Sequence, residues 1–382
     1  MREIPNIVPR VSLVIPTLNE QDTIGECIQK ARAVFQEMGM EADIIVADSS
    51  SDQTPRIARS LGAVVVKVDR LGYGNAYLGG FAWARGDYIV IMDGDLTYDP
   101  GEIPQFIEKL DQGADFVIGT RLKGKILPHA MPGLHRYLGN PLLTGLLNLL
   151  FTTGISDAHC GMRAIRRSAL EKLQLRTGGM EFASEMVIEA SRRGLRIDEV
   201  PITYYPRRGE SKLSSLSDGW RHLRFMMLYR PVPFLLVPGL VAMALGVALT
   251  IAVLDQGRWS EIRMHSLILG SLLSIIGYQT LLAGMYFAAF GATYGVSGRS
   301  GWLNRMISYH SLEKTLLLGL ALLAAGVLLG ASVLLDWREA GYGTLYEVQS
   351  AMMALILSIL GLQTVFSGMF ISLLLLKDGY ER

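Results

Sequence analysis

Two carboxylates one residue apart form the sharpest chemical signal in the sequence. Asp93 and Asp95 flank a glycine and follow the apolar run 88–92, which is typical of a buried β-strand. Acids delivered together to the end of a strand can hold one hard divalent cation, Mg²⁺ or Mn²⁺, which would neutralise a departing diphosphate. An Asp-Gly turn is the ordinary alternative for such a tripeptide. The position directly after an apolar strand, with Asp99 and Pro100 opening the next helix, favours the metal site.

The elements that must position these acids alternate between short β-branched runs and amphipathic segments. This alternation predicts an α/β domain with a mostly parallel sheet and helices on both faces. In such sheets, ligands bind beyond the carboxyl ends of the strands, where the strand order reverses. Strands are expected at 11–15, 43–47, 63–68 and 88–92, with helices at 21–38, 54–61 and 74–84.

Polar residues fill the loops that follow these strands, and their chemistry suits a nucleotide-activated sugar. The base, ribose, diphosphate and metal of such a ligand each need a polar partner. The G-x-G-x-x-G pattern of a dinucleotide site is absent after the first strand. A plain turn explains the glycines of segment 71–75 about as well as a phosphate loop does. The loops concerned are 16–20, 48–52, 69–74 and 93–95.

The overall composition excludes several classes of protein. A formal net charge of +1 gives no basis for a nucleic-acid partner. Cys27 and Cys160 are too few for a disulfide framework, so a reducing compartment is expected. A zinc site at His159 and Cys160 is rejected because no second ligand pair has the right spacing. Residues 1–10 lack the apolar run of a cleaved signal peptide.

The second half of the chain predicts an integral multi-pass membrane protein. Four stretches lack Asp, Glu, Lys and Arg, and each exceeds the roughly 20 residues that cross a bilayer as a helix. Flanking basic residues predict a cytoplasmic N-terminal half at the cell membrane. We expect a catalytic domain at 1–208, an interfacial amphipathic segment at 209–230 and a transmembrane domain at 231–382. The four spans are expected at 231–254, 266–298, 315–335 and 348–376.

The transmembrane half repeats itself as two helical hairpins, with Gln279 and Gln363 equivalent at an offset of 84 positions. These two glutamines could contact lipid or substrate, but hydrogen bonds between helices are the preferred interpretation. The paired hairpins leave room for contacts in a homo-oligomer.

Seven blocks in order give the first half a specific resemblance. From about residue 11 to 224 the chain resembles the family 2 inverting glycosyltransferases, especially dolichyl-phosphate mannose and glucose synthases and their bacterial polyprenyl-phosphate relatives. The resemblance implies a GT-A fold. It also implies metal-dependent transfer of a hexose from a UDP- or GDP-sugar to polyprenyl or dolichyl phosphate. The blocks are 14–20, 48–52, 72–76, 93–95, 118–121, 156–163 and 209–212.

The same resemblance assigns the donor site. Ala47, Ser49 and Thr97 depart from the family pattern. The identity of the nucleotide base and the remaining metal ligand therefore stay open. The catalytic residues are expected to be Asp93, Asp95, Arg121 and Asp157. Of these, Asp93 and Asp95 are expected to hold the metal. The nucleotide sugar is expected to contact Pro16, Thr17, Asn19, Glu20, Asp48, Asp52, Gly74, Asp93 and Gly94.

The acceptor needs cationic positioning more than it needs a base. A phosphate monoester is largely ionised near neutral pH because its second pKa is about 6. Arginine binds phosphate through two parallel hydrogen bonds, and the resemblance favours Arg121 and Arg136. A basic patch at the membrane surface is the equal alternative for Arg207, Arg208 and Lys212. The candidates are Arg121, Arg136, Arg207, Arg208, Ser211 and Lys212.

Two carboxylates keep open interpretations. Asp157 could act as a base or bind a sugar hydroxyl, or it could only brace Arg163. Glu185 could orient the sugar or an arginine, or it could face solvent on a helix.

Two segments predict contact with the bilayer surface. Residues 141–151 are apolar but too short to span the membrane, and core packing explains them equally well. In the interfacial segment, one helical face carries Leu216, Trp220, Leu223 and Met227.

The rival functions are a polysaccharide synthase, a glycolipid glycosyltransferase and a non-catalytic scaffold or lipid carrier. Residues 256–259 do not match the Gln-x-x-Arg-Trp block of processive synthases, because their spacing is too short. The intact acid pair and the arginines oppose the scaffold.

Overall fold

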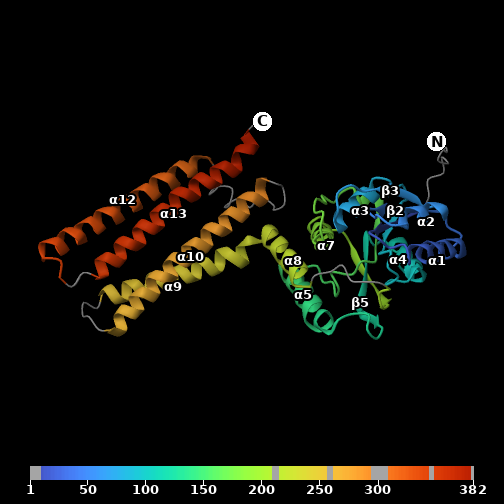
Figure 1. Ribbon diagram of the computed structural model, residues 1–382, viewed down its shortest axis with the longest axis horizontal. Coiled ribbons are helices and arrows are strands. Elements are labelled where there is room, and N and C mark those ends of the chain that lie inside the picture. Colours follow the sequence, from blue (N-terminus) through green and yellow to red (C-terminus); the bar gives the residue numbers. More distant parts are fainter. Residues whose placement is uncertain (1–9, 209–214, 256–260, 294–308, 344–347, 380–382) are drawn as a thin grey trace. The chain divides into compact units, whose positions relative to one another are not determined.

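The computed structural model describes residues 10–208, 215–255, 261–293, 309–343 and 348–379 (Figure 1). The chain divides into two compact units, Met1–Arg224 and Phe225–Arg382. Their boundary falls within the segment 209–230 that the sequence suggests is interfacial.

A seven-stranded sheet organises the first unit, in the order β3-β2-β1-β4-β6-β5-β7. β1 is parallel to both β2 and β4, whereas β6 is antiparallel to β4 and β5. The expected mostly parallel α/β sheet is confirmed, and its strand order reverses between β1 and β4. The strands are β1 (Val11–Thr17), β2 (Ala42–Asp48), β3 (Val64–Lys67), β4 (Tyr88–Ile91), β5 (Phe116–Ile126), β6 (Arg163–Arg166) and β7 (Ile197–Tyr204).

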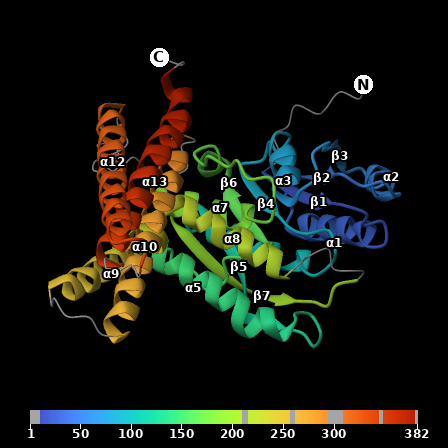
Figure 2. The same cartoon turned by 60° about the vertical axis from the view of Figure 1, so that its left-hand side comes forward.

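Helices cover both faces of this sheet (Figure 2). Leu13 and Val14 point to opposite faces of β1, and both are fully buried, as expected of a strand between two helical layers. The helix expected at 21–38 begins only at Ile24, because the backbone amides of Thr23 and Ile24 first form a turn onto the Glu20 carbonyl. The helices are α1 (Ile24–Glu37), α2 (Thr54–Ser60), α3 (Tyr73–Phe81), α4 (Ile103–Asp111), α5 (Asn140–Phe151), α6 (Arg167–Leu170), α7 (Phe182–Arg192) and α8 (Ser215–Tyr229), with short turns η1 (Pro100–Glu102) and η2 (His135–Gly139).

In its described residues the second unit contains four long apolar helices, preceded by the short turn η3 (Val232–Leu236). All four are long and apolar enough to cross a bilayer, which confirms the expected membrane domain and makes the chain an integral membrane protein. Their apolar spans are Val232–Val253, Met264–Thr293, Leu312–Glu339 and Val348–Leu374. The helices are α9 (Val237–Asp255), α10 (Glu261–Thr293), α12 (Tyr309–Glu339) and α13 (Val348–Gly379).

Glycines bring the helices of each hairpin into close contact, and they do so in the same way twice. A Cβ atom at Gly246 of α9 would lie 2.4 Å from the Ser274 nitrogen of α10. In the second hairpin, a Cβ atom at Gly326 would lie 2.5 Å from the Ser358 nitrogen. Ser274 and Ser358 are separated by the same offset as Gln279 and Gln363. The sequence repeat is therefore also a repeat of packing.

Hydroxyl groups join the two hairpins to each other. The Tyr278 hydroxyl lies 2.5 Å from the Thr364 Oγ1 atom, and Tyr286 is hydrogen-bonded to Ser367. Within the described residues, the buried Oε1 atom of Gln363 has no hydrogen-bond partner. Tyrosines thus make these links between α10 and α13, where glutamines were expected.

Candidate active site

A cavity of about 350 Å³ lies at the carboxyl ends of β1 and β4. The end of β1 contributes Pro16 and Thr17, the loop after it contributes Glu20, and the loop after β4 contributes the segment 93–95. Because the strand order reverses between these two strands, the cavity occupies the position where α/β sheets bind ligands.

The acid pair is held in a fixed arrangement in this cavity. The Asp95 Oδ1 atom accepts hydrogen bonds from the backbone nitrogen and the hydroxyl of Thr97, at 3.0 and 2.6 Å. The Tyr77 hydroxyl donates to the Asp93 Oδ1 atom at 3.4 Å. Thr97 therefore orients one of the two acids.

The electrostatics of the pair favour a cation. Burial, and then the charge of Asp95, raise the pKa of Asp93 to about 7, although Arg207 and two tyrosines partly offset this rise. Within the described chain, no cluster of three or more His, Cys, Asp or Glu side chains could hold a metal. Two carboxylates still suit Mg²⁺ or Mn²⁺, since such ions commonly take their other ligands from water and substrate phosphates. Asp93 and Asp95 would hold the ion, which would neutralise charge on a bound diphosphate.

This raised pKa predicts pH-dependent metal binding. Below a pKa of about 7 the Asp93 carboxyl is mostly protonated, so a metal ion must displace a proton. We expect the affinity for Mn²⁺ to rise by roughly tenfold or more between pH 5.5 and 7.5. Calorimetric titration of the full-length protein measures this change. In Asp93→Asn the dependence should be much flatter, and an equal slope in that variant would assign the proton to another group.

Arg121 enters the cavity as part of a buried ion pair. Its Nε and Nη2 atoms donate to the two carboxylate oxygens of Asp157, at 2.7 and 2.8 Å. The guanidinium also lies over the Tyr204 ring, 5.2 Å from its centroid. Burial alone would raise the pKa of Asp157, but Arg121 outweighs burial and holds that pKa below its ordinary value. The pair thus fixes a cation beside the acids.

Asp157 braces Arg121, so the alternative that it braces Arg163 is wrong. Arg163 is itself buried, and its guanidinium donates to three backbone carbonyls. Those carbonyls belong to Ala158, Cys160 and Ala183.

The remaining arginines occupy different places. Arg207 lines the cavity, with its Nε atom 3.4 Å from Asp95 Oδ2 and its Nη2 atom 3.2 Å from Glu20 Oε1. Arg208 instead pairs with Glu26 at 2.6 Å on the exposed surface. Arg136 lies over the Tyr137 ring and is not among the described residues that line the cavity. Ser211 and Lys212 lie outside the described residues.

Three residues were expected to bind the nucleotide but are absent from the described cavity lining. Their side chains instead form hydrogen bonds within the loops at the ends of the strands. Asn19, with a φ of 54°, accepts a hydrogen bond from the Ser51 nitrogen at 2.9 Å. Asp48 accepts from the Thr17 hydroxyl at 2.8 Å, and Asp52 accepts from the nitrogen of Thr54 at 2.9 Å. Of the described residues, the cavity lining includes none of these three side chains.

Gly74 has a packing role that the phosphate-loop interpretation missed. A Cβ atom there would lie 2.1 Å from the Thr177 carbonyl oxygen, so glycine lets α3 approach the loop before α7. The neighbouring Asn75 nitrogen donates to the Gly178 carbonyl at 3.1 Å. Gly179 and Met180 of this loop line the cavity. The packing of Gly74 therefore positions a cavity wall.

Glu185 of α7 fixes the same loop through hydrogen bonds. It is buried, so the alternative of a solvent-facing carboxylate is wrong. It accepts hydrogen bonds from the nitrogens of Arg176 and Thr177, at 3.0 and 2.9 Å, and from the Thr177 hydroxyl at 2.6 Å. Burial raises the pKa of this carboxyl, and the bonds from Thr177 and Arg176 partly offset that rise.

Replacing Glu185 by alanine should destabilise the protein, because three partly buried hydrogen bonds would lose their acceptor. The expected cost is about 2 kcal/mol, or roughly 4–8 °C in Tm. Thermal unfolding in detergent measures this loss. Glu108→Ala, on an exposed position of α4, is the control and should unfold like the wild type. Equal Tm values for the two variants would contradict the role of Glu185.

Several lining residues were missed by sequence reasoning. Arg221 and His222 belong to α8, which the sequence presented only as a membrane-surface helix. Tyr204 ends β7, a parallel strand, so the rule of reading strand ends could have found it. The other missed residues include Tyr98 and His159.

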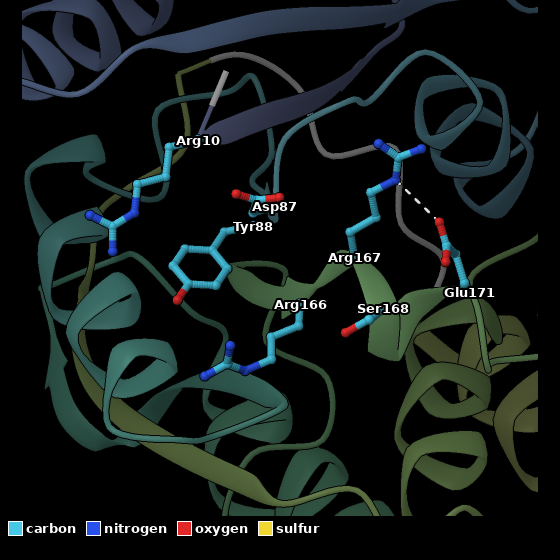
Figure 3. A pocket seen from close by; sticks show the side chains of 7 residues that line it. All are labelled: Arg10, Asp87, Tyr88, Arg166, Arg167, Ser168 and Glu171. Atoms are coloured by element: carbon cyan, nitrogen blue, oxygen red, sulfur yellow. Dashed lines mark hydrogen bonds and ion pairs between the residues drawn. The ribbon is translucent and has the colours of Figure 1, made fainter. Parts of the chain in front are cut away.

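A second depression, of about 420 Å³, lies near the opposite ends of the strands (Figure 3). Its arginines are engaged in structural bonds. Arg10 pairs with Asp111 at 2.6 Å, Arg167 pairs with Glu171 at 3.2 Å, and the Nε atom of Arg166 donates to a backbone carbonyl at 2.9 Å. These cations brace the fold around the start of β4.

Comparisons with known proteins identify the family of the chain. Residues 12–174 match Glycosyl transferase family 2, and residues 285–375 match the Glycosyltransferase family 2 C-terminal transmembrane region. The low-salt glycan biosynthesis hexosyltransferase Agl6 of Haloferax volcanii is 40% identical over 374 residues, which cover 94% of this chain and 88% of that protein. A dolichyl-phosphate hexose transferase of the same organism is 33% identical over 210 residues, which cover 55% and 89%. A dolichol-phosphate mannosyltransferase of Pyrococcus furiosus is 30% identical over 228 residues, which cover 57% and 64%. The chain therefore belongs to glycosyltransferase family 2, as a glycosyltransferase that spans the membrane.

Proposed function

We propose that this protein transfers a hexose, glucose or mannose, from a UDP- or GDP-sugar to polyprenyl or dolichyl phosphate, with inversion, at the cytoplasmic face of the cell membrane. The observation that carries the proposal is the buried Arg121 held by Asp157 in the same cavity as Asp93 and Asp95. One end of such a site suits a diphosphate with its metal, and the other suits a second phosphate. The names of the dolichyl-phosphate relatives support the same pair of substrates.

The donor would lie along the loops after β1 and β4. Pro16, Thr17 and Glu20 face the cavity beside the acid pair, within reach of a nucleotide diphosphate. A bound divalent ion supplies charge neutralisation of the leaving diphosphate. Arg207 bridges Glu20 and Asp95 and adds a positive charge to the same wall.

The acceptor phosphate would bind to Arg121, whose direction is set before the lipid arrives. One phosphate oxygen attacks the anomeric carbon while the bond from that carbon to the diphosphate oxygen breaks, so the configuration inverts. The attacking phosphate is already anionic near neutral pH and needs no strong base. Both oxygens of Asp157 are engaged by Arg121, and its pKa is lowered, so we assign Asp157 to positioning.

Exposed apolar side chains explain how a lipid could reach this unit. On and beside α5, large hydrophobic residues are exposed while Leu147 and Phe151 are buried on the other side of the helix. Such an amphipathic arrangement suits the plane of a membrane interface. Trp220 of α8 is also exposed. The exposed residues around α5 are Leu134, Tyr137, Leu138, Leu142 and Leu149.

A defined assay tests the proposal. The purified full-length protein is incubated with Mn²⁺, undecaprenyl or dolichyl phosphate, and each of a panel of UDP- and GDP-sugars. We expect one donor class to be consumed, with a lipid product that carries a single sugar. A product that carries a growing chain would instead identify a polysaccharide synthase. Folded protein that turns over no donor would overturn the proposal and restore the scaffold.

A further inference from the structure

A chain of three polar side chains forms part of the cavity wall. The Ser184 hydroxyl of α7 lies 2.8 Å from the Nδ1 atom of His222 on α8 and 3.3 Å from the Nε2 atom of His159. Figure 2 shows α7 and α8 side by side, and the two imidazole rings meet edge to face with centroids 4.5 Å apart. Both histidines line the cavity, while Ser184 is fully buried.

One ring nitrogen in this group of three side chains lacks a hydrogen bond within the described residues. The Nδ1 atom of His159 is buried and has no hydrogen-bond partner within the described chain. A buried polar atom without a partner is costly in a folded protein, so a group outside the chain, a water, an ion or a ligand, is expected to complete the bond. His159 therefore lacks a partner on the side that Ser184 does not occupy.

The loop that carries His159 lies close to the acid pair, where the donor would bind. Two residues along the chain, a Cβ atom at Gly161 would lie 2.6 Å from the Asp93 Oδ2 atom. The loop that carries His159 therefore borders the acid pair, where the diphosphate of the donor would lie. The sugar is covalently attached to that diphosphate, so it would lie close to the acid pair and to the loop that borders it.

The charge state of the ring indicates which chemical group it would bind. Burial and the neighbouring His222 lower the pKa of His159 well below its ordinary value, so the ring is neutral near pH 7. A neutral imidazole is a poor ligand for phosphate, and Arg121, Arg207 and Arg221 already supply positive charge to this cavity. A sugar hydroxyl, which is uncharged and both donates and accepts, suits a neutral ring nitrogen.

The hydrogen bond between Ser184 and His159 allows the Nδ1 atom of His159 to act either as a donor or as an acceptor. If Ser184 donates to the Nε2 atom of His159, then the Nδ1 atom carries the proton and donates to the ligand. If His159 donates to Ser184, the Nδ1 atom accepts instead. Because His222 bonds the same hydroxyl, the three residues fix the ring while leaving either form available.

We propose that His159 is a specificity-determining residue that hydrogen-bonds one hydroxyl of the donor hexose through its Nδ1 atom, with Ser184 and His222 positioning its ring. This inference rests on the proposed function, since it requires a sugar nucleotide in the cavity. A site built to bind a hydroxyl discriminates against a sugar that lacks it, because the buried nitrogen is then left unpaired.

Deoxy sugars test the inference directly. The donor that the wild type uses, UDP-glucose or GDP-mannose, is compared with its 2-, 3-, 4- and 6-deoxy forms. For the wild type, we expect removal of one particular hydroxyl to lower kcat/KM by roughly 10- to 100-fold. In His159→Phe the normal donor should lose a similar factor, and the penalty at that one position should disappear. His129→Asn removes an exposed histidine and should keep the wild-type pattern.

Two further variants separate positioning from folding. His159→Asn places an amide near the Nδ1 position and should retain more of the discrimination than His159→Phe. Ser184→Ala should raise the KM for the donor more than it lowers kcat, and it should weaken the penalty at the same hydroxyl. If His159→Phe does not fold, Ser184→Ala carries the test. Unchanged penalties at all four positions in the folded variants would overturn the inference, whereas a wild type that uses no sugar nucleotide would overturn the proposed function.

Discussion

Asp95→Asn is expected to lower kcat/KM by roughly 10³-fold or more while the protein remains folded. Asparagine has nearly the same shape as aspartate and can still accept the bonds from Thr97, so the loss should come from the charge. A metal ion contributes several kcal/mol to the stabilisation of a leaving diphosphate, and each 1.4 kcal/mol corresponds to tenfold in rate. The measurement is single-sugar transfer to undecaprenyl phosphate at saturating Mn²⁺.

Chelation should abolish turnover of the wild type, and added Mn²⁺ or Mg²⁺ should restore it. Asp22→Asn removes an exposed carboxylate at the turn before α1 and serves as the matched control, with wild-type turnover expected. Undiminished transfer by Asp95→Asn would mean that the acid pair does not hold the metal, and the donor half of the proposed mechanism would fail.

The sequence predicted those parts of the site that depend on local order along the chain. The Asp93 and Asp95 pair follows a strand whose residues are all apolar, so its place at the sheet edge could be inferred without knowing any distant contact. The four expected strands form the parallel half of the sheet, because their β-branched runs and spacing are local properties. The membrane spans were equally visible, since a bilayer excludes charge from every residue of a span.

The sequence could not show which distant side chains meet. One of the roles considered for Asp157 paired it with the wrong arginine. Arg163 is near Asp157 in sequence, whereas its actual partner Arg121 lies 36 positions away. The three polar residues His159, Ser184 and His222 come from a loop and two helices, and only the folded chain brings them together. Arg136 shows the converse, because its residue type suited phosphate although the fold leaves it outside the cavity lining.

The second large effect is expected from Arg121→Lys. Lysine keeps one charge but carries all its donors on a single nitrogen, so it cannot reproduce the two parallel bonds to Asp157 while it presents a separate nitrogen to a phosphate. We expect kcat/KM for the lipid phosphate to fall by roughly 100-fold or more, with little change in the KM for the donor. Arg56→Lys, on the exposed side of α2, is the matched control.

Asp157→Asn distinguishes positioning from proton transfer at this ion pair. If Asp157 positions Arg121, the variant should raise the KM for the lipid phosphate and lose roughly 10- to 100-fold in kcat/KM, because the guanidinium is no longer held by two charged bonds. The double variant should then lose little more than Arg121→Lys alone, since residues that act as one unit are not additive. A base would behave differently, because its removal would lower kcat far more than it raised the KM. In that case the losses in the double variant would multiply, and Asp157 would have to be assigned to the chemical step itself.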